Sequence, residues 1–344
     1  MRCLKIPKKK GEEVRNKLLE DELLYKDGKI ETTDKHIFLP IKEDAVNKLS
    51  DLENFDYEIV KKDIEERKKV ERDYKKRVDI PEEKREYLPS SYDIIGEIAL
   101  LKIPEDIIDY RFEIGKAILE THKNLKSVFL DKGVKGQFRI RDLENLAGEN
   151  NTETVHKEHG SEMLVDVENA YFSPRLATER WRVVNCVNDG EVVLDMFAGV
   201  GPYTVLIGNN IRVKHIHSID LNPDAVKYLT KNVQKNDLQD IVTVHEGDAE
   251  KISPDLSCDR VIMNLPHSTK SFIDPALSAI KSRGIIHYYE ILEEDDEERR
   301  REEVLNKIES KGFSVELKNK RVVRTYSVTE IQMVYDLFVE RKRF

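Results

Sequence analysis

Short runs of apolar residues, with no polar residue alternating in them, recur through the second half of the chain and constrain its fold more than any other feature. They cover residues 192–196, 216–219, 242–245, 260–263 and 285–288, and segments of helix length separate them. Because a strand buried on both faces has no polar side, such runs indicate a mostly parallel sheet covered by helices on both faces, an α/β fold. Two later runs, 314–323 and 330–339, are rich in β-forming residues and predict an antiparallel edge.

A glycine-rich turn follows the first of these runs, in the order Asp195-Met196-Phe197-Ala198-Gly199-Val200-Gly201-Pro202. Glycine lets a ligand approach the backbone closely, and Pro202 stands where the next helix would begin, a position that tolerates its missing N–H. The glycine fingerprint of dinucleotide folds is incomplete, because Thr204 replaces its third glycine. The turn therefore favours a cofactor without a pyrophosphate group.

Polar residues follow the next three runs in sequence order. Asp220 is placed to accept hydrogen bonds from both ribose hydroxyls of an adenosine, and Asp248 to accept one from the adenine amino group. Asn264 and Pro266 follow the fourth run, where the amide of Asn264 could hold the edge of a planar nitrogen heterocycle beside the cofactor. Acidic residues after strands are also ordinary helix caps, so the ordered set carries more weight than either aspartate alone.

Together these elements resemble the class I S-adenosylmethionine-dependent methyltransferase fold, which is Rossmann-like, and Asn264-Leu265-Pro266 resembles the Asn-Pro-Pro-Tyr motif of enzymes that methylate base nitrogens. Segments 136–150 and 171–180, with His287-Tyr288-Tyr289, are similar to the archaeal and eukaryotic tRNA guanine-N1 methyltransferases that act on guanosine 37 beside the anticodon. Within this family, the sequence of residues 171–180 is most similar to that of the archaeal subgroup whose members can also methylate the wyosine precursor 4-demethylwyosine. His267 stands in place of the motif's aromatic residue, and 324–328 departs from the family's Tyr-Ala-Pro.

The resemblance implies S-adenosylmethionine as the cofactor. The residues expected to hold it are Asp195, Phe197, Gly199, Gly201, Asp220, Asp248 and Asn264.

Guanine N1 carries a proton, and its lone pair belongs to a lactam, so methylation needs a base for that proton and a donor that stabilises charge on O6. The resemblance implies Glu179 as the base, Arg139 as the O6 partner and Asn264 as the group that orients the guanine edge. A carboxylate works as this base only if a dry site raises its pKa. From the residues alone, Glu179 could equally cap a helix, and Arg139 could bind phosphate or face solvent on a strand shared with Arg141.

The net charge of −9, from 58 Lys+Arg against 67 Asp+Glu, argues against a protein that coats nucleic acid non-specifically. A specific partner needs only a local basic face, and basic residues gather in 132–141, 175–182 and 318–324. We therefore expect tRNA as the partner, recognised by its anticodon stem-loop and overall shape. The residues expected to bind it are Tyr171, Arg175, Arg180, Pro266 and Arg141, with Tyr171 either stacking or packing.

Several other classes are disfavoured. No stretch approaches the roughly 20 apolar residues of a membrane-spanning helix, and the first segment carries charges throughout. Cys3, Cys186 and Cys258 are too far apart in sequence for a CxxC metal site, and their odd number argues against a disulfide framework. His156 and His159 lack further ligands at metal-binding spacing. We expect a cytoplasmic monomer with no metal and no membrane partner.

The chain of 344 residues is longer than one hydrophobic core usually organises. We expect a small α+β unit over 1–60, a charged linker over 61–87, a middle α+β unit over 88–170 and the methyltransferase domain over 171–344. The resemblance implies that the first unit recognises tRNA and that the middle unit binds RNA and supports catalysis.

Two other functions stay open. The aminocarboxypropyl transferase of the wyosine pathway shares the fold and the cofactor, and a non-catalytic tRNA-binding protein could retain the fold. A cysteine-dependent pyrimidine C5 methyltransferase is disfavoured, because no cysteine adjoins Pro266.

Overall fold

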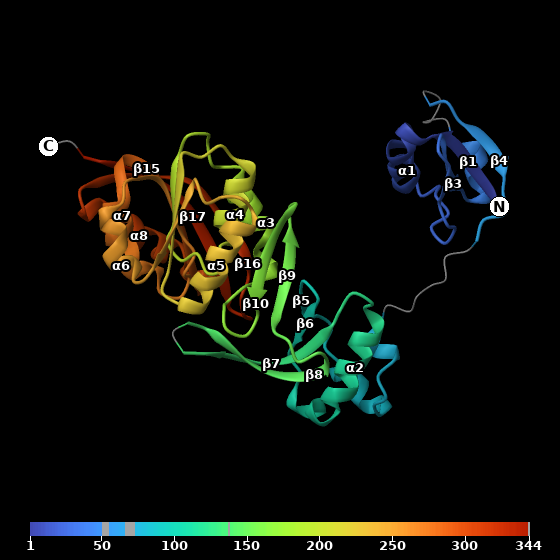
Figure 1. The fold of residues 1–344 in the computed structure, drawn as a ribbon, viewed down its shortest axis with the longest axis horizontal. Helices are drawn as coiled ribbons and strands as arrows, with labels where there is room; N and C mark the ends of the chain where they lie inside the picture. Colours follow the sequence, from blue (N-terminus) through green and yellow to red (C-terminus); the bar gives the residue numbers. More distant parts are fainter. Residues whose placement is uncertain (50–54, 66–72, 137, 343–344) are drawn as a thin grey trace. The chain divides into compact units, whose positions relative to one another are not determined.

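The computed structural model describes residues 1–49, 55–65, 73–136 and 138–342. The chain forms two compact units, Met1–Arg72 and Asp73–Phe344 (Figure 1). Within the described residues, no helix has the length and apolar character needed to cross a membrane.

The first unit is a sheet in the order β2-β3-β1-β4 with one helix, α1, packed on it. Its elements are β1 (Arg2–Pro7), α1 (Gly11–Glu20), β2 (Glu31–Thr32), β3 (His36–Pro40) and β4 (Glu58–Lys61). Val14 and Leu18, one turn apart on α1, are fully buried against Leu4, Ile6 and Leu39 of the sheet. This spacing places both side chains on one face of the helix, which is why the unit can form its own core.

The second unit is built around a sheet with the strand order β13-β12-β11-β14-β15-β17-β16. These strands are β11 (Val192–Asp195), β12 (His215–Asp220), β13 (Val242–Glu246), β14 (Cys258–Met263), β15 (Ile280–Glu293), β16 (Phe313–Thr325) and β17 (Glu330–Arg341). Neighbours from β13 to β15 are parallel, whereas β17 runs antiparallel to both β15 and β16. The predicted mostly parallel sheet with an antiparallel C-terminal edge is confirmed.

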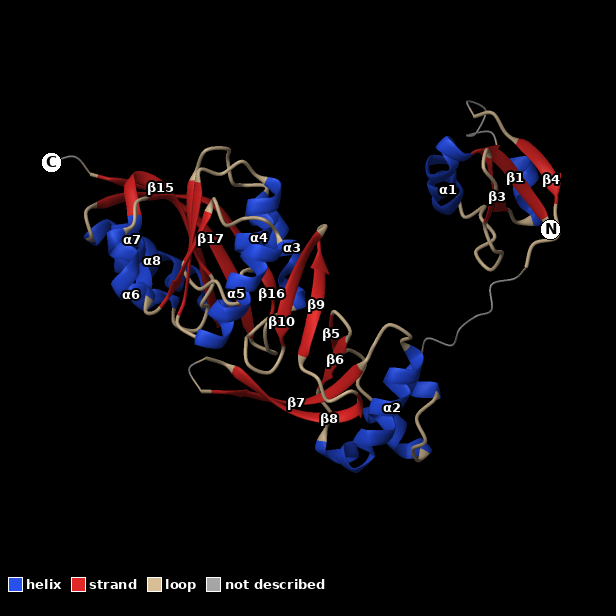
Figure 2. Cartoon of the chain, viewed as in Figure 1, coloured by secondary structure: helices blue, strands red, loops and turns tan. Residues whose placement is uncertain are grey.

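Helices cover both faces of this sheet (Figure 2). One face carries α3 (Ala177–Val184), α4 (Pro202–Asn210) and α5 (Pro223–Lys235), and the other carries α6 (Ala249–Ile252), α7 (Ile273–Ala279) and α8 (Glu297–Ser310). Val193 packs with Leu206 of α4, while the next residue, Leu194, packs with Leu277 of α7 and Val304 of α8. Successive strand residues point to opposite faces, so burial on both sides explains the continuous apolar run.

Residues before the large sheet form a smaller sheet, β5-β6-β7-β8, and a hairpin of β9 and β10. The elements are β5 (Asp93–Ile95), β6 (Ile98–Leu101), α2 (Arg111–Thr121), β7 (Ser127–Lys135), β8 (Ile140–Gly148), β9 (Glu153–Glu158) and β10 (Ser161–Asp166). One core joins Ile95 and Phe129 to Val165 of β10 and to Val205 and Tyr228 of α4 and α5. The expected boundary at residue 170 therefore crosses a continuous core.

The charged segment expected as a linker, 61–87, is different in the structure. Its residues 66–72 lie outside the described part of the chain. From Asp73 onward the chain is packed, with short 3-10 helices at Tyr74–Lys76 and Glu82–Tyr87. Tyr74, Val78 and Ile80 are buried in the core that covers α2, so apolar residues among the charges anchor this part of the segment.

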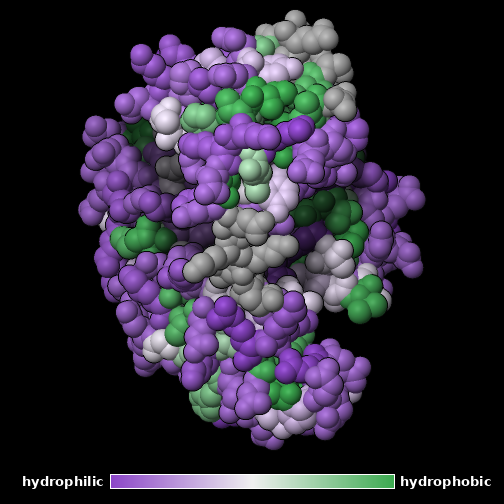
Figure 3. Space-filling model, turned by 90° about the vertical axis from the view of Figure 1, so that its right-hand side faces the viewer, coloured by the Kyte–Doolittle hydropathy of each residue, from purple (hydrophilic) through white to green (hydrophobic). Residues whose placement is uncertain are grey.

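The face of the molecule drawn in Figure 3 consists mostly of hydrophilic residues, and its apolar residues form separate patches. Charged residues make up 36% of the chain. The apolar runs that predict the sheet lie in its core.

Candidate active site

A cavity of about 530 Å³ lies where the order of the parallel strands reverses, at the carboxyl ends of β11, β12, β13 and β14. Ligands of open α/β sheets bind at this switch point, because loops on either side of it diverge. The predicted site residues that line the cavity are Arg139, Tyr171, Arg180, Phe197, Gly199, Asp220, Asp248, Asn264 and Pro266. Four strand ends and the β7–β8 hairpin therefore meet in one pocket.

The glycine turn after β11 has the backbone that only glycine adopts easily. Gly199 has φ +57° and Gly201 has φ +86°. A Cβ on Gly201 would lie 2.4 Å from Cδ1 of Leu229, so the close packing of α4 and α5 also requires glycine there. Pro202 begins α4, as the turn predicts.

Two carboxylates predicted to hold the cofactor lie on the pocket wall. Asp220 accepts hydrogen bonds from the backbone N–H of Gly199 at 2.6 Å and of Asn222 at 2.9 Å, and burial raises the pKa of its carboxyl. Each oxygen keeps a further lone pair for a ligand. Asp248 caps α6 by accepting from the N–H of Glu250 at 3.0 Å, so it caps a helix and also lines the pocket.

Asp195 stands behind the turn and is not among the described residues that line the pocket. Its carboxylate is 1% exposed and accepts a hydrogen bond from the hydroxyl of Thr204 at 2.9 Å. Burial raises the pKa of Asp195 to about 7. Thr204 also bonds Ser218 at 2.7 Å, so the residue that replaces the third glycine ties the turn to β12. Gly201, likewise, supports the turn without lining the pocket.

Arg139 lies in the turn between β7 and β8, not on the strand that the sequence predicts, and has φ +53°. Its guanidinium carbon lies 5.4 Å from the ring centroid of Tyr171, and that of Arg141 lies 5.8 Å from the same ring. Arg141 is buried and donates from Nη2 to the carbonyl of Phe172 at 3.0 Å. The turn therefore points Arg139 to the pocket, while Arg141 anchors the segment that carries Tyr171.

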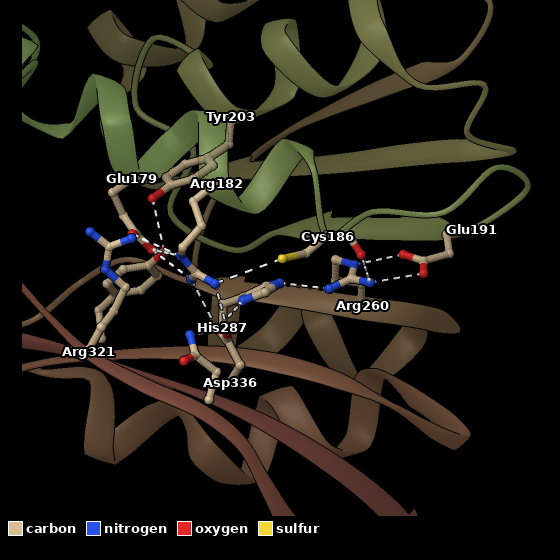
Figure 4. A network of polar contacts seen from close by, with 11 residues as sticks. Glu179, Arg182, Cys186, Glu191, Tyr203, Arg260, His287, Arg321 and Asp336 are labelled. Carbon is tan, nitrogen blue, oxygen red and sulfur yellow. Dashed lines mark hydrogen bonds and ion pairs between the residues drawn. The ribbon is translucent and has the colours of Figure 1, made fainter.

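Glu179 lies beneath the pocket wall rather than in it. Its side chain is 3% exposed, and the described pocket lining does not include it. Its Oε1 accepts hydrogen bonds from Nη2 of Arg182 at 2.8 Å and from the hydroxyl of Tyr289 at 2.7 Å (Figure 4). Tyr289 in turn accepts from the hydroxyl of Tyr203, a residue of the pocket wall, at 3.1 Å. Two tyrosines thus connect the carboxylate to the pocket.

The two arginines expected to bind substrate have protein partners. Arg180 is 2% exposed, and its Nε and Nη2 donate to the two carboxylate oxygens of Glu158 at 2.7 and 2.5 Å. Arg175 pairs with Asp93 at 2.7 Å and keeps an exposed side chain. Only Arg175 is accessible enough to meet a large ligand from outside, whereas Arg180 supports the wall.

The C-terminal hairpin supplies pocket residues that sequence reasoning missed. Arg324, Tyr326 and Gln332 line the cavity. The Arg324 Nε donates to Oε1 of Gln332 at 2.8 Å, and the Tyr326 ring lies edge-on to His267 at 5.4 Å. Burial, reinforced by the charge of Arg139, lowers the pKa of His267, so its ring is neutral near pH 7. The only signal for this contact in the sequence is that both segments depart from the family pattern.

Comparison with known families gives three matches that together cover most of the chain. The description "TRM5/TYW2 methyltransferase domain" matches residues 154–318, "TYW2 N-terminal domain" matches 75–152, and "tRNA methyltransferase 5 N-terminal domain" matches 3–49. The domain with the cofactor pocket therefore includes the β9–β10 hairpin.

Curated relatives are similar over most or all of the chain. The tRNA (guanine(37)-N(1))-methyltransferase Trm5b of Pyrococcus abyssi is 39% identical over 98% of both chains. The tRNA (guanine(37)-N(1))/4-demethylwyosine(37)-methyltransferase Taw22 of Nanoarchaeum equitans is 35% identical over 64% of this chain and 72% of its own. A tRNA(Phe) (4-demethylwyosine(37)-C(7)) aminocarboxypropyltransferase of Methanocaldococcus jannaschii is 30% identical over 73% of this chain and 98% of its own.

Solved structures agree with these relatives. Trm5b from Pyrococcus abyssi has a TM-score of 0.74 at 38% identity over 99% of both chains. A complex of aTrm5 with tRNALeu has a TM-score of 0.68 at 36% identity over 98% of this chain and 99% of that one. Trm5 of Methanocaldococcus jannaschii in complex with adenosine has a TM-score of 0.65 at 37% identity over 100% of both chains. On its sequence, pocket and fold, the chain belongs to the TRM5/TYW2 family of tRNA-modifying S-adenosylmethionine-dependent transferases.

Proposed function

We propose that this protein methylates N1 of guanosine 37 in tRNA, with S-adenosylmethionine as the methyl donor. The observation that carries the proposal is the single pocket in which the glycine turn and Asp220 meet Arg139 and Asn264. A full-length relative at 39% identity, named for this reaction, supports it.

The residues of the pocket fit S-adenosylmethionine. Asp220 offers carboxylate lone pairs to two ribose hydroxyls, and the turn at Gly199 leaves the backbone open to a ligand. Asp248 lies one strand further along and can accept from the adenine amino group, while Phe197 and Phe272 supply an apolar wall for the ring. S-adenosylmethionine bound there supplies an electrophilic methyl group.

Three side chains have the catalytic roles. Arg139 donates to guanine O6 as negative charge develops there, a kind of contact whose removal costs about 10²- to 10³-fold in rate. Asn264, in the loop after β14, orients the guanine edge toward the donor. Glu179 accepts the N1 proton, and for this its carboxylate turns from Arg182 and Tyr289 toward the pocket.

We assign the substrate contacts by whether each side chain lines the cavity, is exposed to solvent or is buried in the wall. Tyr171, under two guanidinium groups, offers a face for the turned-out base, and Pro266 lines the same cavity. Arg175 is placed to meet the tRNA backbone, while Arg141 and Arg180 hold the wall from within.

We infer that the first unit recognises the shape of the tRNA. Its residues 3–49 match the N-terminal domain of tRNA methyltransferase 5. We also infer that the protein works as a monomer in the cytoplasm, where a tRNA substrate is available.

A second activity, methylation of 4-demethylwyosine at the same nucleotide, is favoured by the similarity to a relative named for both substrates. Transfer of an aminocarboxypropyl group is the competing chemistry. The relative named for it covers 73% of this chain, against 98% for the guanosine methyltransferase.

The test is incubation of labelled donor with tRNA transcripts that carry guanosine or adenosine at position 37, followed by mass analysis of the nucleosides. We expect 1-methylguanosine from the guanosine transcript alone. A product heavier by an aminocarboxypropyl group, or no product despite donor binding, would refute the proposal. Glu179→Gln and Arg139→Ala should each slow single-turnover methylation at least about tenfold while donor binding is retained.

A further inference from the structure

A chain of buried charged groups starts at Glu179 and leads away from the pocket (Figure 4). Arg182 donates to Glu179 from Nε and Nη2, and to Asp336 of β17 from Nη1 at 2.6 Å and from Nη2 at 3.1 Å. The side chains of Glu179, Arg182 and Asp336 are 3%, 17% and 8% exposed. Arg182 is therefore shared between two carboxylates in a place that water barely reaches.

The far side of Asp336 is fixed by a neutral histidine. His287 is 1% exposed, with Nδ1 2.6 Å from Asp336 and Nε2 2.8 Å from Nη1 of Arg260. A guanidinium only donates, so Nε2 accepts, and the proton of His287 lies on Nδ1 and is donated to Asp336. Burial lowers the pKa of His287 and so favours this neutral form. Although burial alone would raise the pKa of Asp336, hydrogen bonds from His287 and Arg182 hold it well below its usual range. Asp336 is thus a permanent anion.

The shared position of Arg182 matters once Glu179 moves. A buried ion that loses its partner is strongly destabilised, which would hold Glu179 in place if Arg182 had no other anion. Asp336 provides that anion, with two hydrogen bonds of its own to Arg182. Glu179 can therefore leave without stranding a buried charge.

We propose that Arg182 is a positioning residue for Glu179, and that Asp336 retains Arg182 when the Glu179 carboxylate turns toward the bound guanosine. This inference rests on the proposed function, in which Glu179 is the base.

The groups around the Glu179 carboxylate come from several elements. Arg182 is on its own helix, Tyr289 is on β15, and Arg321 of β16 lies 3.8 Å from Oε2. Tyr203 of α4 is one hydrogen bond further, behind Tyr289. Among the described residues, the two charged groups at hydrogen-bond or ion-pair distance from this carboxylate, Arg182 and Arg321, are both cations.

The test is the pH dependence of the single-turnover rate, with donor and tRNA saturating, in the full-length protein. A hydrogen bond to a charged group contributes about 1.5–3 kcal/mol, so Arg182→Gln should move the acidic limb to higher pH by about one to two units. Asp336→Asn should move the acidic limb of the rate–pH profile to lower pH and reduce the maximal rate, because Arg182 then binds Glu179 alone. Arg182→Lys should restore part of the shift. If the acidic limb of the rate–pH profile stays at the wild-type pH in both Arg182→Gln and Asp336→Asn, the inference is wrong.

Glu191→Gln is the matched control. Glu191 pairs with Arg260 at the other end of the chain, so its loss disturbs a buried ion pair without touching Glu179. It should lower the melting temperature and leave the acidic limb in place; if it shifts the limb as Arg182→Gln does, the effect is general destabilisation and the inference is wrong. Should Arg182→Gln fail to fold, the direction of the Asp336→Asn shift decides. Absence of 1-methylguanosine from the wild-type protein would instead contradict the proposed function, and an acidic limb that persists in Glu179→Gln would contradict the base assignment.

Discussion

The ion pair between Glu158 and Arg180 leads to a stability prediction that can be worked from burial. Both side chains are nearly inaccessible, at 4% and 2% exposure, and the guanidinium donates to both carboxylate oxygens. Glu158→Gln would leave the charge of Arg180 buried without its anion, at a cost of about 3–5 kcal/mol. The carbonyl of Ser173 still accepts a hydrogen bond from Arg180 at 3.1 Å in this variant, so we expect the loss of stability to lie at the lower end of this range. We expect a loss of about 3 kcal/mol, or about 6–12 °C in melting temperature.

Glu162→Gln is the control for this prediction. Glu162 also sits on the β9–β10 hairpin and also pairs with cations, Lys157 at 2.7 Å and Lys235 at 3.0 Å, but its side chain is 39% exposed. Solvent screens such a pair, so the melting temperature of Glu162→Gln should stay near that of the wild type. Urea unfolding followed by circular dichroism measures both variants. Equal, small losses in the two would show that burial does not set the strength of the Glu158 pair.

The pH dependence gives an independent check. Burial alone would raise the pKa of Glu158, but hydrogen bonds from Arg180 and His156 hold it at about 2 in the folded protein. Because the folded pKa lies below the ordinary value of about 4.3, the stabilisation is present above that pH and is lost as the pH falls toward 2. The difference between wild type and Glu158→Gln should narrow as the pH falls below about 4.3. A gap that keeps widening below this pH would contradict the assignment.

Asp220→Asn removes the charge that we propose receives the donor ribose, and it should weaken donor binding by roughly 10- to 100-fold in calorimetry, with an unchanged melting temperature. Gly201→Ala combines a left-handed backbone, which costs about 1–2 kcal/mol, with a contact on Leu229, so it should destabilise more than Gly312→Ala, where φ is +84° but the space is open. Equal losses in these two alanine variants would show that the contact is relieved. Tyr326→Ala should raise the tRNA KM by roughly fivefold to 100-fold if the ring stacks on a nucleotide, and a fall in donor affinity instead would contradict that role.

The sheet could be predicted from the sequence because each strand is indicated by residues that are adjacent in the chain. Each apolar run and the polar residue after it are adjacent in the chain, so Asp220, Asp248 and Asn264 necessarily follow strand ends. Parallel strands then bring those ends to one edge, and the pocket lining contains all three. Asp195, which the resemblance implies as a cofactor residue, is the last residue of β11, and its buried carboxylate accepts a hydrogen bond from Thr204.

Contacts between distant segments could not be predicted. Two partners of Glu179 come from β15 and β16, more than a hundred residues away, and no local pattern links them to it. Arg139 and Arg141 alternate as strand residues do, but the β7–β8 hairpin reverses at Arg139, which adopts a positive φ. The segment 61–87 was predicted to be a linker because charged residues dominate its composition. The composition does not reveal that a few residues among them, including Tyr74 and Val78, are buried.

The core shared by the β9–β10 hairpin and helices α4 and α5 also bears on how the protein is made. The hairpin is synthesised before either helix, so Met163 and Val165, both fully buried in the finished fold, have no cover at first. Domains of this size expose apolar surface while they fold, and such surface promotes aggregation. The cover arrives with Val205 and Tyr228, and β15 and β16 supply Tyr289 and Arg321 as partners of Glu179 only in the last part of the chain. A nascent chain therefore acquires these contacts of Glu179 last, after the glycine turn and Asp220 have been synthesised.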